Sequence, residues 1–178
     1  MSDAIHAPFW LRDNFAPTPD EVSTSSLEVL GTIPTDLKGR YLRTGPNPIS
    51  GPSEHWFLGD GMIHGIELAD GEANWFKSQL IQTPMLGRPE GENYFTKAMQ
   101  SLENGLGNTH VIGHAGKILA LEELHYPFEM TAELETVGAY DFGGKLATGM
   151  TAHPKICAKT GELLFFGYGL VPPYLTYH

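Results

Sequence analysis

Three evenly spaced hairpin signals restrict the fold more than any other feature of the sequence. Each consists of two apolar-rich runs around a glycine turn, a pattern typical of antiparallel β-hairpins. The turns lie at Asp70-Gly71, Ala115-Gly116 and Thr160-Gly161. Their glycines are 45 residues apart in both intervals. A repeat of roughly 40–50 residues in a chain of short strands favours propeller blades, with a sandwich or an open barrel as the alternatives.

The composition fits a folded, turn-rich β protein. With 178 residues the chain is long enough for one domain or for a piece of a larger one. Hydrophobic residues make up 41%, which is enough for a packed core, and 21 glycines with 13 prolines favour many turns over long helices. The net charge of −10 argues against nucleic acid as a partner and disfavours electrostatic docking on anionic lipid.

The sequence also predicts where the protein resides. Cys157 is the single cysteine, so an internal disulfide is excluded and a reducing compartment is favoured. The first residues lack the basic start and apolar stretch of a secretory signal. No window approaches the ~20 apolar residues that a membrane span requires. We therefore expect a cytoplasmic protein.

Residues 1–22 are polar and rich in proline, which predicts an extended N-terminal arm before a β domain over 23–178. One short helix is expected near 93–104, with Asn93 as its N-cap and Gly105 as its stop. An apolar stripe at helical spacing supports it, formed by Phe95, Ala98, Met99 and Leu102. Such a helix either caps a sheet edge or forms a lid or membrane-touching element.

His153 lies in the segment Thr151–Lys155, just ahead of the third hairpin. A lone histidine in a β context is more often a core residue than a ligand. Pro154, however, lacks a backbone donor and suits a strand end or a bulge, where a side chain is often turned toward a site. By contrast, His110 and His114 are four residues apart in a strand pattern without the glutamate of a zinc motif, and we interpret both as structural.

These residues carry a family resemblance. The segments "TAHPK" and "TGELLFFGY" resemble the metal-histidine motif of the carotenoid cleavage oxygenases, a family that includes stilbene-cleaving dioxygenases and the retinal pigment epithelium isomerohydrolase. The segments "VLGTIPTDLKGRYLRTGPNP", "HWFLGDGMIHGIEL" and "NTHVIGHAGKILALEE" are similar to earlier parts of the family pattern, in the same order. The resemblance extends from about Asn14 to the last residue.

The resemblance implies a seven-bladed β-propeller in which four histidines hold one ferrous iron per complete chain. His153 matches the first of these ligands. Glu122 matches a glutamate that accepts the far N–H of a metal-bound imidazole, and the adjacent Glu123 is the competing choice; both are otherwise ordinary strand-end carboxylates. No catalytic side chain is implied in this chain beyond the metal site. The other three ligands are expected outside it, because family chains are more than twice as long.

The implied activity is a non-heme iron(II) dioxygenase reaction. O2 and an apolar polyene or stilbene would be the partners, and a conjugated carbon–carbon double bond of a carotenoid, apocarotenoid or stilbene would be cleaved to two carbonyl products. Peripheral membrane contact is also compatible with the resemblance. The alternatives are an isomerohydrolase-type iron enzyme on the same scaffold and a non-catalytic propeller fragment. We expect the chain to be the N-terminal part of such an enzyme, and to be inactive and prone to aggregation by itself.

Overall fold

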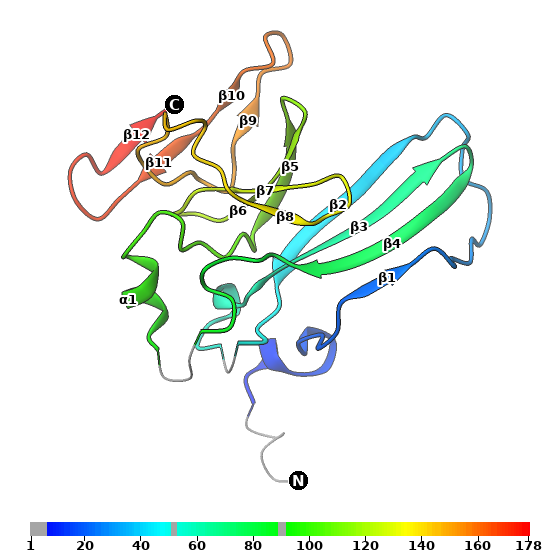
Figure 1. The fold of residues 1–178 in the computed structure, drawn as a ribbon, viewed down its shortest axis with the longest axis horizontal. Helices are drawn as coiled ribbons and strands as arrows, with labels where there is room; N and C mark the ends of the chain where they lie inside the picture. Colours follow the sequence, from blue (N-terminus) through cyan, green and yellow to red (C-terminus); the bar gives the residue numbers. More distant parts are fainter. Residues whose placement is uncertain (1–6, 51–52, 89–91) are drawn as a thin grey trace.

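The structure is a computed structural model that describes residues 7–50, 53–88 and 92–178. Within these ranges the chain consists mainly of short antiparallel strands with one short α-helix, as the sequence predicts (Figure 1). Three single-turn 3-10 helices lie in its N-terminal part: η1 (Phe9–Leu11), η2 (Asp13–Phe15) and η3 (Trp56–Leu58).

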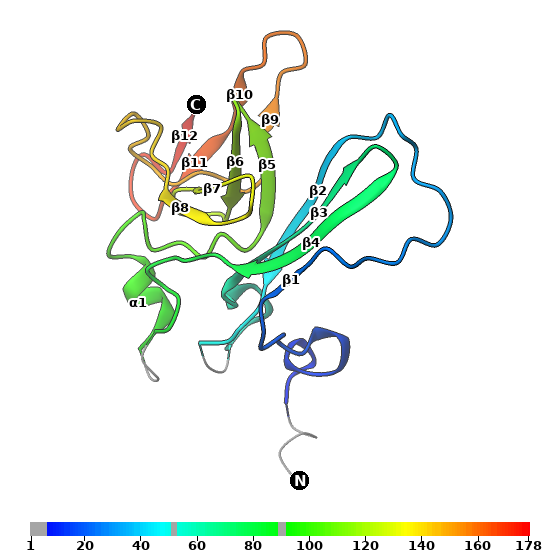
Figure 2. The same ribbon diagram turned by 45° about the vertical axis from the view of Figure 1, so that its right-hand side comes forward.

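Two four-stranded antiparallel sheets form the body of the structure. The first has the order β1-β4-β3-β2 and contains β1 (Val22–Thr24), β2 (Gly39–Pro46), β3 (Gly61–Ala69) and β4 (Glu72–Leu80). The second has the order β5-β6-β7-β8 and contains β5 (His110–His114), β6 (Lys117–Leu121), β7 (Phe128–Met130) and β8 (Thr136–Ala139). The sheets lie side by side, with β2 of the first in contact with β5 of the second (Figures 1 and 2).

The last part of the described chain forms two pairs of very short strands. These are β9 (Lys155–Ile156) with β10 (Leu163–Leu164), and β11 (Phe166–Tyr168) with β12 (Leu175–Tyr177). Both pairs lie beyond the second sheet and away from the first, as the orange and red ribbons show in both views (Figures 1 and 2).

All three predicted hairpins are confirmed. Asp70-Gly71 joins β3 to β4, with φ values of 53° and 84°, and Ala115-Gly116 joins β5 to β6, with φ values of 48° and 78°. Two consecutive residues with positive φ are the mark of a type I′ turn, whose twist matches that of the flanking strands. The third hairpin joins β9 to β10 through a longer loop that contains Gly161, also at positive φ.

The strand β6 is the centre of the packing. Successive side chains of a strand point to opposite faces, and both faces of β6 are covered. Ala120 faces a core shared with the first sheet: Ile63, Ile81, Phe128, Met130 and Leu134. Leu119 and Leu121 face a second core, formed with later parts of the chain: Leu146, Met150, Ala152 and Phe165. The second core fixes the segment that leads to His153.

The predicted helix exists but is shorter than expected. The α-helix α1 spans Tyr94–Ala98, and the side chain of Asn93 caps it by accepting a hydrogen bond from Thr96 N at 3.0 Å. The predicted N-cap is therefore confirmed, whereas the predicted stop at Gly105 is wrong. The apolar stripe does not pack as one face: Ala98 is buried, but Phe95 and Met99 are 57% and 61% exposed. A single turn cannot bury all positions of that stripe.

The described part of the predicted arm contains η1 and η2, and its last residue, Val22, begins β1. Rings of Phe9 and Phe15 make edge-to-face contacts with Trp56 of η3, at centroid distances of 5.1 and 5.5 Å. Asn47 accepts a hydrogen bond from Thr18 N at 2.7 Å and donates one to Thr18 O at 2.9 Å. Residues 1–6 of the arm lie outside the described residues, and the boundary at residue 22 stays a prediction.

Candidate functional site

His153 lies on an irregular segment that connects the second core to β9. Two residues before it, Thr151 is buried and its backbone N–H donates to Phe166 O at 2.9 Å. Ala152 is also completely buried. The next side chain, that of His153, is 65% exposed. His153 is therefore a surface side chain on a firmly anchored backbone and not a core histidine. Pro154 follows it directly before β9, at a strand end as predicted.

Glu123 is the carboxylate that meets this imidazole. Its Oε1 lies 2.8 Å from Nε2 of His153. Its Oε2 accepts hydrogen bonds from Thr151 Oγ1 at 3.1 Å and from the Tyr168 hydroxyl at 3.0 Å, and a longer one from Ala152 N at 3.4 Å. The carboxylate is thus held by donors from two other segments, and its orientation does not depend on His153.

The Tyr168 hydroxyl is a stable donor in this arrangement. Burial raises the pKa of Tyr168, and the hydrogen bond to Glu123 and the negative charges of Glu123 and Glu122 raise it further, to about 12. The hydroxyl therefore keeps its proton throughout the neutral range. Because Tyr168 lies on β11 and Glu123 follows β6, the hydrogen bond also ties the last strand pair to the second sheet.

His110 and His114 have structural contacts, in agreement with their interpretation from sequence. The Nδ1 atom of His110 lies 2.8 Å from Ala152 O, and its ring stacks on that of His153 with centroids 6.3 Å apart. The Nε2 atom of His114 lies 3.0 Å from Gly161 O, which connects the second and third hairpins. His110 therefore supports the same segment that Glu123 holds.

Glu122 points away from His153. It is 6% exposed, accepts a hydrogen bond from Leu106 N at 3.0 Å, and contacts Nδ1 of His125. Glu122 and Glu123 are adjacent at the end of β6, so their side chains leave on opposite faces. The orienting role expected for Glu122 stays a prediction, but it is Glu123 that contacts His153. Sequence reasoning missed His125, because no motif or periodicity distinguishes it.

The described residues alone do not form a metal centre. Over 7–50, 53–88 and 92–178 no three His, Cys, Asp or Glu side chains are placed to hold an ion together. What the described chain offers is a single exposed imidazole with an anchored carboxylate beside it. One such donor fits a ligand set that other parts of a longer protein complete, and it does not fit a site that is complete within these residues.

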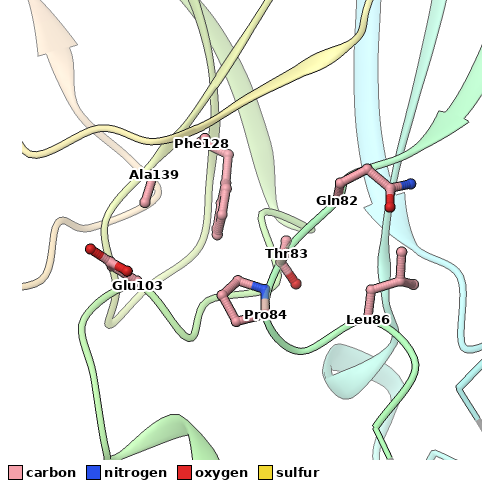
Figure 3. Close-up of a pocket in the computed structure, with 8 residues that line it drawn as sticks. Gln82, Thr83, Pro84, Leu86, Glu103, Phe128 and Ala139 are labelled. Atoms are coloured by element: carbon pink, nitrogen blue, oxygen red, sulfur yellow. The ribbon is translucent and has the colours of Figure 1, made fainter.

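Two cavities lie elsewhere on the described surface. One, of about 420 Å³, lies between the segment after β4 and the strands β7 and β8 (Figure 3). Gln82, Thr83 and Pro84 line it on one side and Phe128 and Ala139 on another, and neither His153 nor Glu123 belongs to its lining. The second, of about 390 Å³, lies between α1 and the β11–β12 strand pair and includes Tyr168 and His125 in its wall.

No helix within the described ranges is long and apolar enough to span a membrane.

Sequence and structure comparisons place the chain among known proteins. The profile of the retinal pigment epithelial membrane protein family matches residues 15–178. A carotenoid cleavage oxygenase of Mycobacterium tuberculosis is 42% identical over 165 residues, which cover 89% of this chain and 33% of the relative. Carotenoid 9,10(9',10')-cleavage dioxygenase 1 of Arabidopsis thaliana is 37% identical over 212 residues, which cover 99% of this chain and 39% of the relative.

Solved structures agree with these relatives. The lignostilbene dioxygenase of Pseudomonas brassicacearum superposes with a TM-score of 0.76 at 33% identity, over 86% of this chain and 35% of that protein. A variant of the Synechocystis apocarotenoid oxygenase superposes with a TM-score of 0.69 at 25% identity, over 86% of this chain and 38% of that protein. The chain therefore spans between a third and two fifths of the length of these relatives.

Proposed function

Because the chain belongs to the retinal pigment epithelial membrane protein family, we propose that it is part of a dioxygenase that cleaves a conjugated carbon–carbon double bond. The substrate would be a carotenoid, an apocarotenoid or a stilbene, and the products two carbonyl compounds. The observation that carries this proposal is the 42% identity to a carotenoid cleavage oxygenase over 165 residues. The likeness to a lignostilbene dioxygenase, at 33% identity, supports the wider substrate range.

In the complete protein, His153 would supply one of four imidazole ligands to ferrous iron. When bound, iron provides the open coordination position and the redox chemistry that O2 needs to react with an alkene. The exposed ring on an anchored backbone supports this assignment, because a ligand must reach outward to meet donors from other segments while its own position stays fixed.

Glu123 would hold the His153 ring for that role. Metal-binding imidazoles commonly have a carboxylate or carbonyl beside them that fixes ring orientation. Glu123 has the required position, 2.8 Å from the ring, and is itself held by Tyr168 and Thr151. We therefore favour Glu123 over Glu122 as the orienting carboxylate of His153.

The architecture of the complete protein would be a seven-bladed β-propeller. The two four-stranded antiparallel sheets, which lie side by side, have the form of propeller blades. The pairs β9–β10 and β11–β12 would then belong to blades that further chain completes. This agrees with the share of each relative that the chain covers.

The partners follow from the same proposal. O2 and an apolar polyene or stilbene would enter the complete active site, and the net charge of −10 supports the absence of a nucleic-acid partner. The exposed side chains of Phe95 and Met99 on α1 support a peripheral membrane contact near an apolar entrance. A cytoplasmic location is compatible with all of these partners.

The proposal is tested with the complete protein, iron-loaded and incubated in air with β-carotene, an apocarotenal and a hydroxylated stilbene in turn. We expect one substrate to disappear while two carbonyl products of complementary mass form, and we expect this to require iron. The His153→Ala variant is the matched negative control, and His114→Gln is the matched positive control, because the His114 ring hydrogen-bonds to Gly161 O of the third hairpin and not to the segment that carries His153. Absence of carbonyl products from all three substrates in the iron-loaded protein would contradict the proposal.

A further inference from the structure

The buried pair of Glu122 and His125 has no part in the proposed reaction. The side chains of Glu122 and His125 are only 7% and 4% exposed, and both belong to the corner between β6 and β7. Nδ1 of His125 contacts Glu122, and Nε2 lies 3.0 Å from the backbone carbonyl of Ala98, the last residue of α1. One imidazole ring thus connects the second sheet to α1, the only α-helix among the described residues.

Both ring nitrogens of His125 face an acceptor. A neutral imidazole carries one N–H, so it can donate either to the carboxylate or to the carbonyl, whereas the imidazolium donates to both. A backbone carbonyl has no proton to give, and Glu122 is already accepting from Leu106 N at 3.0 Å. With Glu122 ionised, the two acceptors around this buried ring are therefore satisfied together only when the ring is doubly protonated.

We propose that Glu122 and His125 form a protonation-dependent clamp that holds α1 against the second sheet. With the imidazolium in place, α1 is fixed through Ala98. When the ring loses a proton, one of its two hydrogen bonds is lost; the bond to the charged carboxylate is the stronger of the two, so the bond to Ala98 is the one given up. Deprotonation of His125 thus releases α1 from the second sheet, while the sheet itself stays in place.

The consequence of opening lies at the cavity of about 390 Å³ described above. Ala98, Met99 and Leu102 of the α1 region line this cavity together with His125. The opposite wall comes from the β11–β12 strand pair, with Leu170 and Val171 between its strands. Release of α1 would widen this cavity, because one of its walls would no longer be tied to the sheet.

The ionisable groups around the pair favour the charged form of His125. Tyr94 of α1 lies within the field of Glu122, and Arg88 lies 5.6 Å from the Tyr94 ring. Tyr168 of β11 lines the same cavity and is within the field of Glu122, while Glu123 is engaged by His153. Burial raises the pKa of Tyr94, as does the charge of Glu122, so that both tyrosines stay neutral and the carboxylate of Glu122 is the dominant charge near His125.

The direction of the pH dependence follows from the same contacts. Desolvation by burial lowers the pKa of His125, but the hydrogen bond and charge of Glu122 and the carbonyl of Ala98 outweigh it, and the net pKa is raised above its ordinary 6.5. A raised pKa in the folded state means that the clamp contributes fully below about pH 6.5 and is lost as the pH rises through the higher folded value.

The test is hydrogen–deuterium exchange of the α1 peptide in the complete protein between pH 5.5 and 9, corrected for the intrinsic exchange rate. Lys97 N and Met99 N are the reporters, because they donate within α1 to Asn93 O and Phe95 O. We expect their protection to fall by about tenfold or more across the raised pKa, the effect of losing one hydrogen bond from a charged donor. Peptides of β3 and β4 should not change in this range.

Two variants and one direct observation complete the experiment. His125→Phe should give low α1 protection at every pH, and His114→Gln, a histidine outside the pair, should keep the wild-type profile. Because His125→Phe can fail to fold, selective ¹⁵N labelling of histidine in the wild-type protein reads the ring directly, and the clamp requires both His125 nitrogens protonated at pH 6. A neutral His125 at pH 6, or α1 protection that does not change up to pH 9, would overturn the inference.

Discussion

Glu122 and Glu123 are neighbours in sequence, but we predict different defects for their alanine variants. Glu122→Ala should mainly lose stability, and Glu123→Ala should mainly lose affinity for iron. Glu122→Ala leaves His125 as a buried ring without its carboxylate, and breaking a buried ion pair on one side costs about 3–5 kcal/mol of unfolding free energy. Besides its contact with the exposed ring of His153, Glu123→Ala removes an acceptor from three donors. Of these, the Tyr168 hydroxyl can turn to water because Tyr168 is 37% exposed. Only Thr151 and Ala152 lose a partner while buried, for a cost of about 1–3 kcal/mol.

The affinity for iron should show the reverse order, with the larger loss in Glu123→Ala and the smaller loss in Glu122→Ala. Removing the carboxylate that orients a metal-binding imidazole typically costs about 10–100-fold in metal affinity, so Glu123→Ala of the complete protein should lose iron to a chelator far more readily than wild type. Glu122→Ala should retain iron as well as wild type under conditions in which it is folded.

The two measurements are urea unfolding followed by tryptophan fluorescence and iron content after dialysis against a graded chelator. Glu123→Gln serves as the near-isosteric control, since it keeps the acceptor oxygen for Tyr168 but loses the charge beside His153. If Glu122→Ala is the milder variant in stability, or if folded Glu122→Ala loses iron as readily as Glu123→Ala, the division of roles between the two glutamates is wrong.

Three further predictions concern single side chains. His153→Ala should remove iron from the complete protein, measured by metal analysis, yet change the unfolding free energy of the iron-free protein by no more than about 0.5 kcal/mol because the ring is 65% exposed; a folded variant with full iron content would refute its role. Phe128→Ala should lower the unfolding free energy by about 3–5 kcal/mol, since the ring is 1% exposed between the two sheets, and a loss below about 1 kcal/mol in urea unfolding would contradict this packing. Ala115→Asn should raise the thermal midpoint, because Ala115 has a φ of 48° in a type I′ turn and asparagine tolerates that region better; an unchanged or lower midpoint would argue against the turn.

The parts of the fold that the sequence predicted are those set by local chemistry. The turns at Asp70-Gly71 and Ala115-Gly116 were predictable because glycine after a small or polar residue permits two successive positive φ values, and flanking apolar runs supply the strands. The cap of α1 at Asn93 was predictable for the same local reason. The length of α1 was not, because it depends on which apolar side chains find a tertiary partner.

The same dependence on tertiary contacts limits the prediction of the site residues. His153 could be singled out because of Pro154 and the family motif around it. The choice between Glu122 and Glu123 could not be made, because adjacent strand residues face opposite ways and only the pairing of β6 with its neighbours decides which face meets His153. The partner of Glu122, His125, was missed because its role depends on a carbonyl of α1 that lies 27 residues earlier in the chain.

The most direct test of the proposed activity is the fate of molecular oxygen. The complete, iron-loaded protein would be given its carotenoid, apocarotenoid or stilbene substrate under ¹⁸O2, with the carbonyl products reduced quickly to alcohols before their oxygen exchanges with water, and the His153→Ala variant run in parallel. Oxidative cleavage of a double bond predicts ¹⁸O in the carbonyl products and none from the variant. Products without ¹⁸O under these conditions would contradict the dioxygenase assignment and favour an isomerohydrolase-type reaction on the same scaffold.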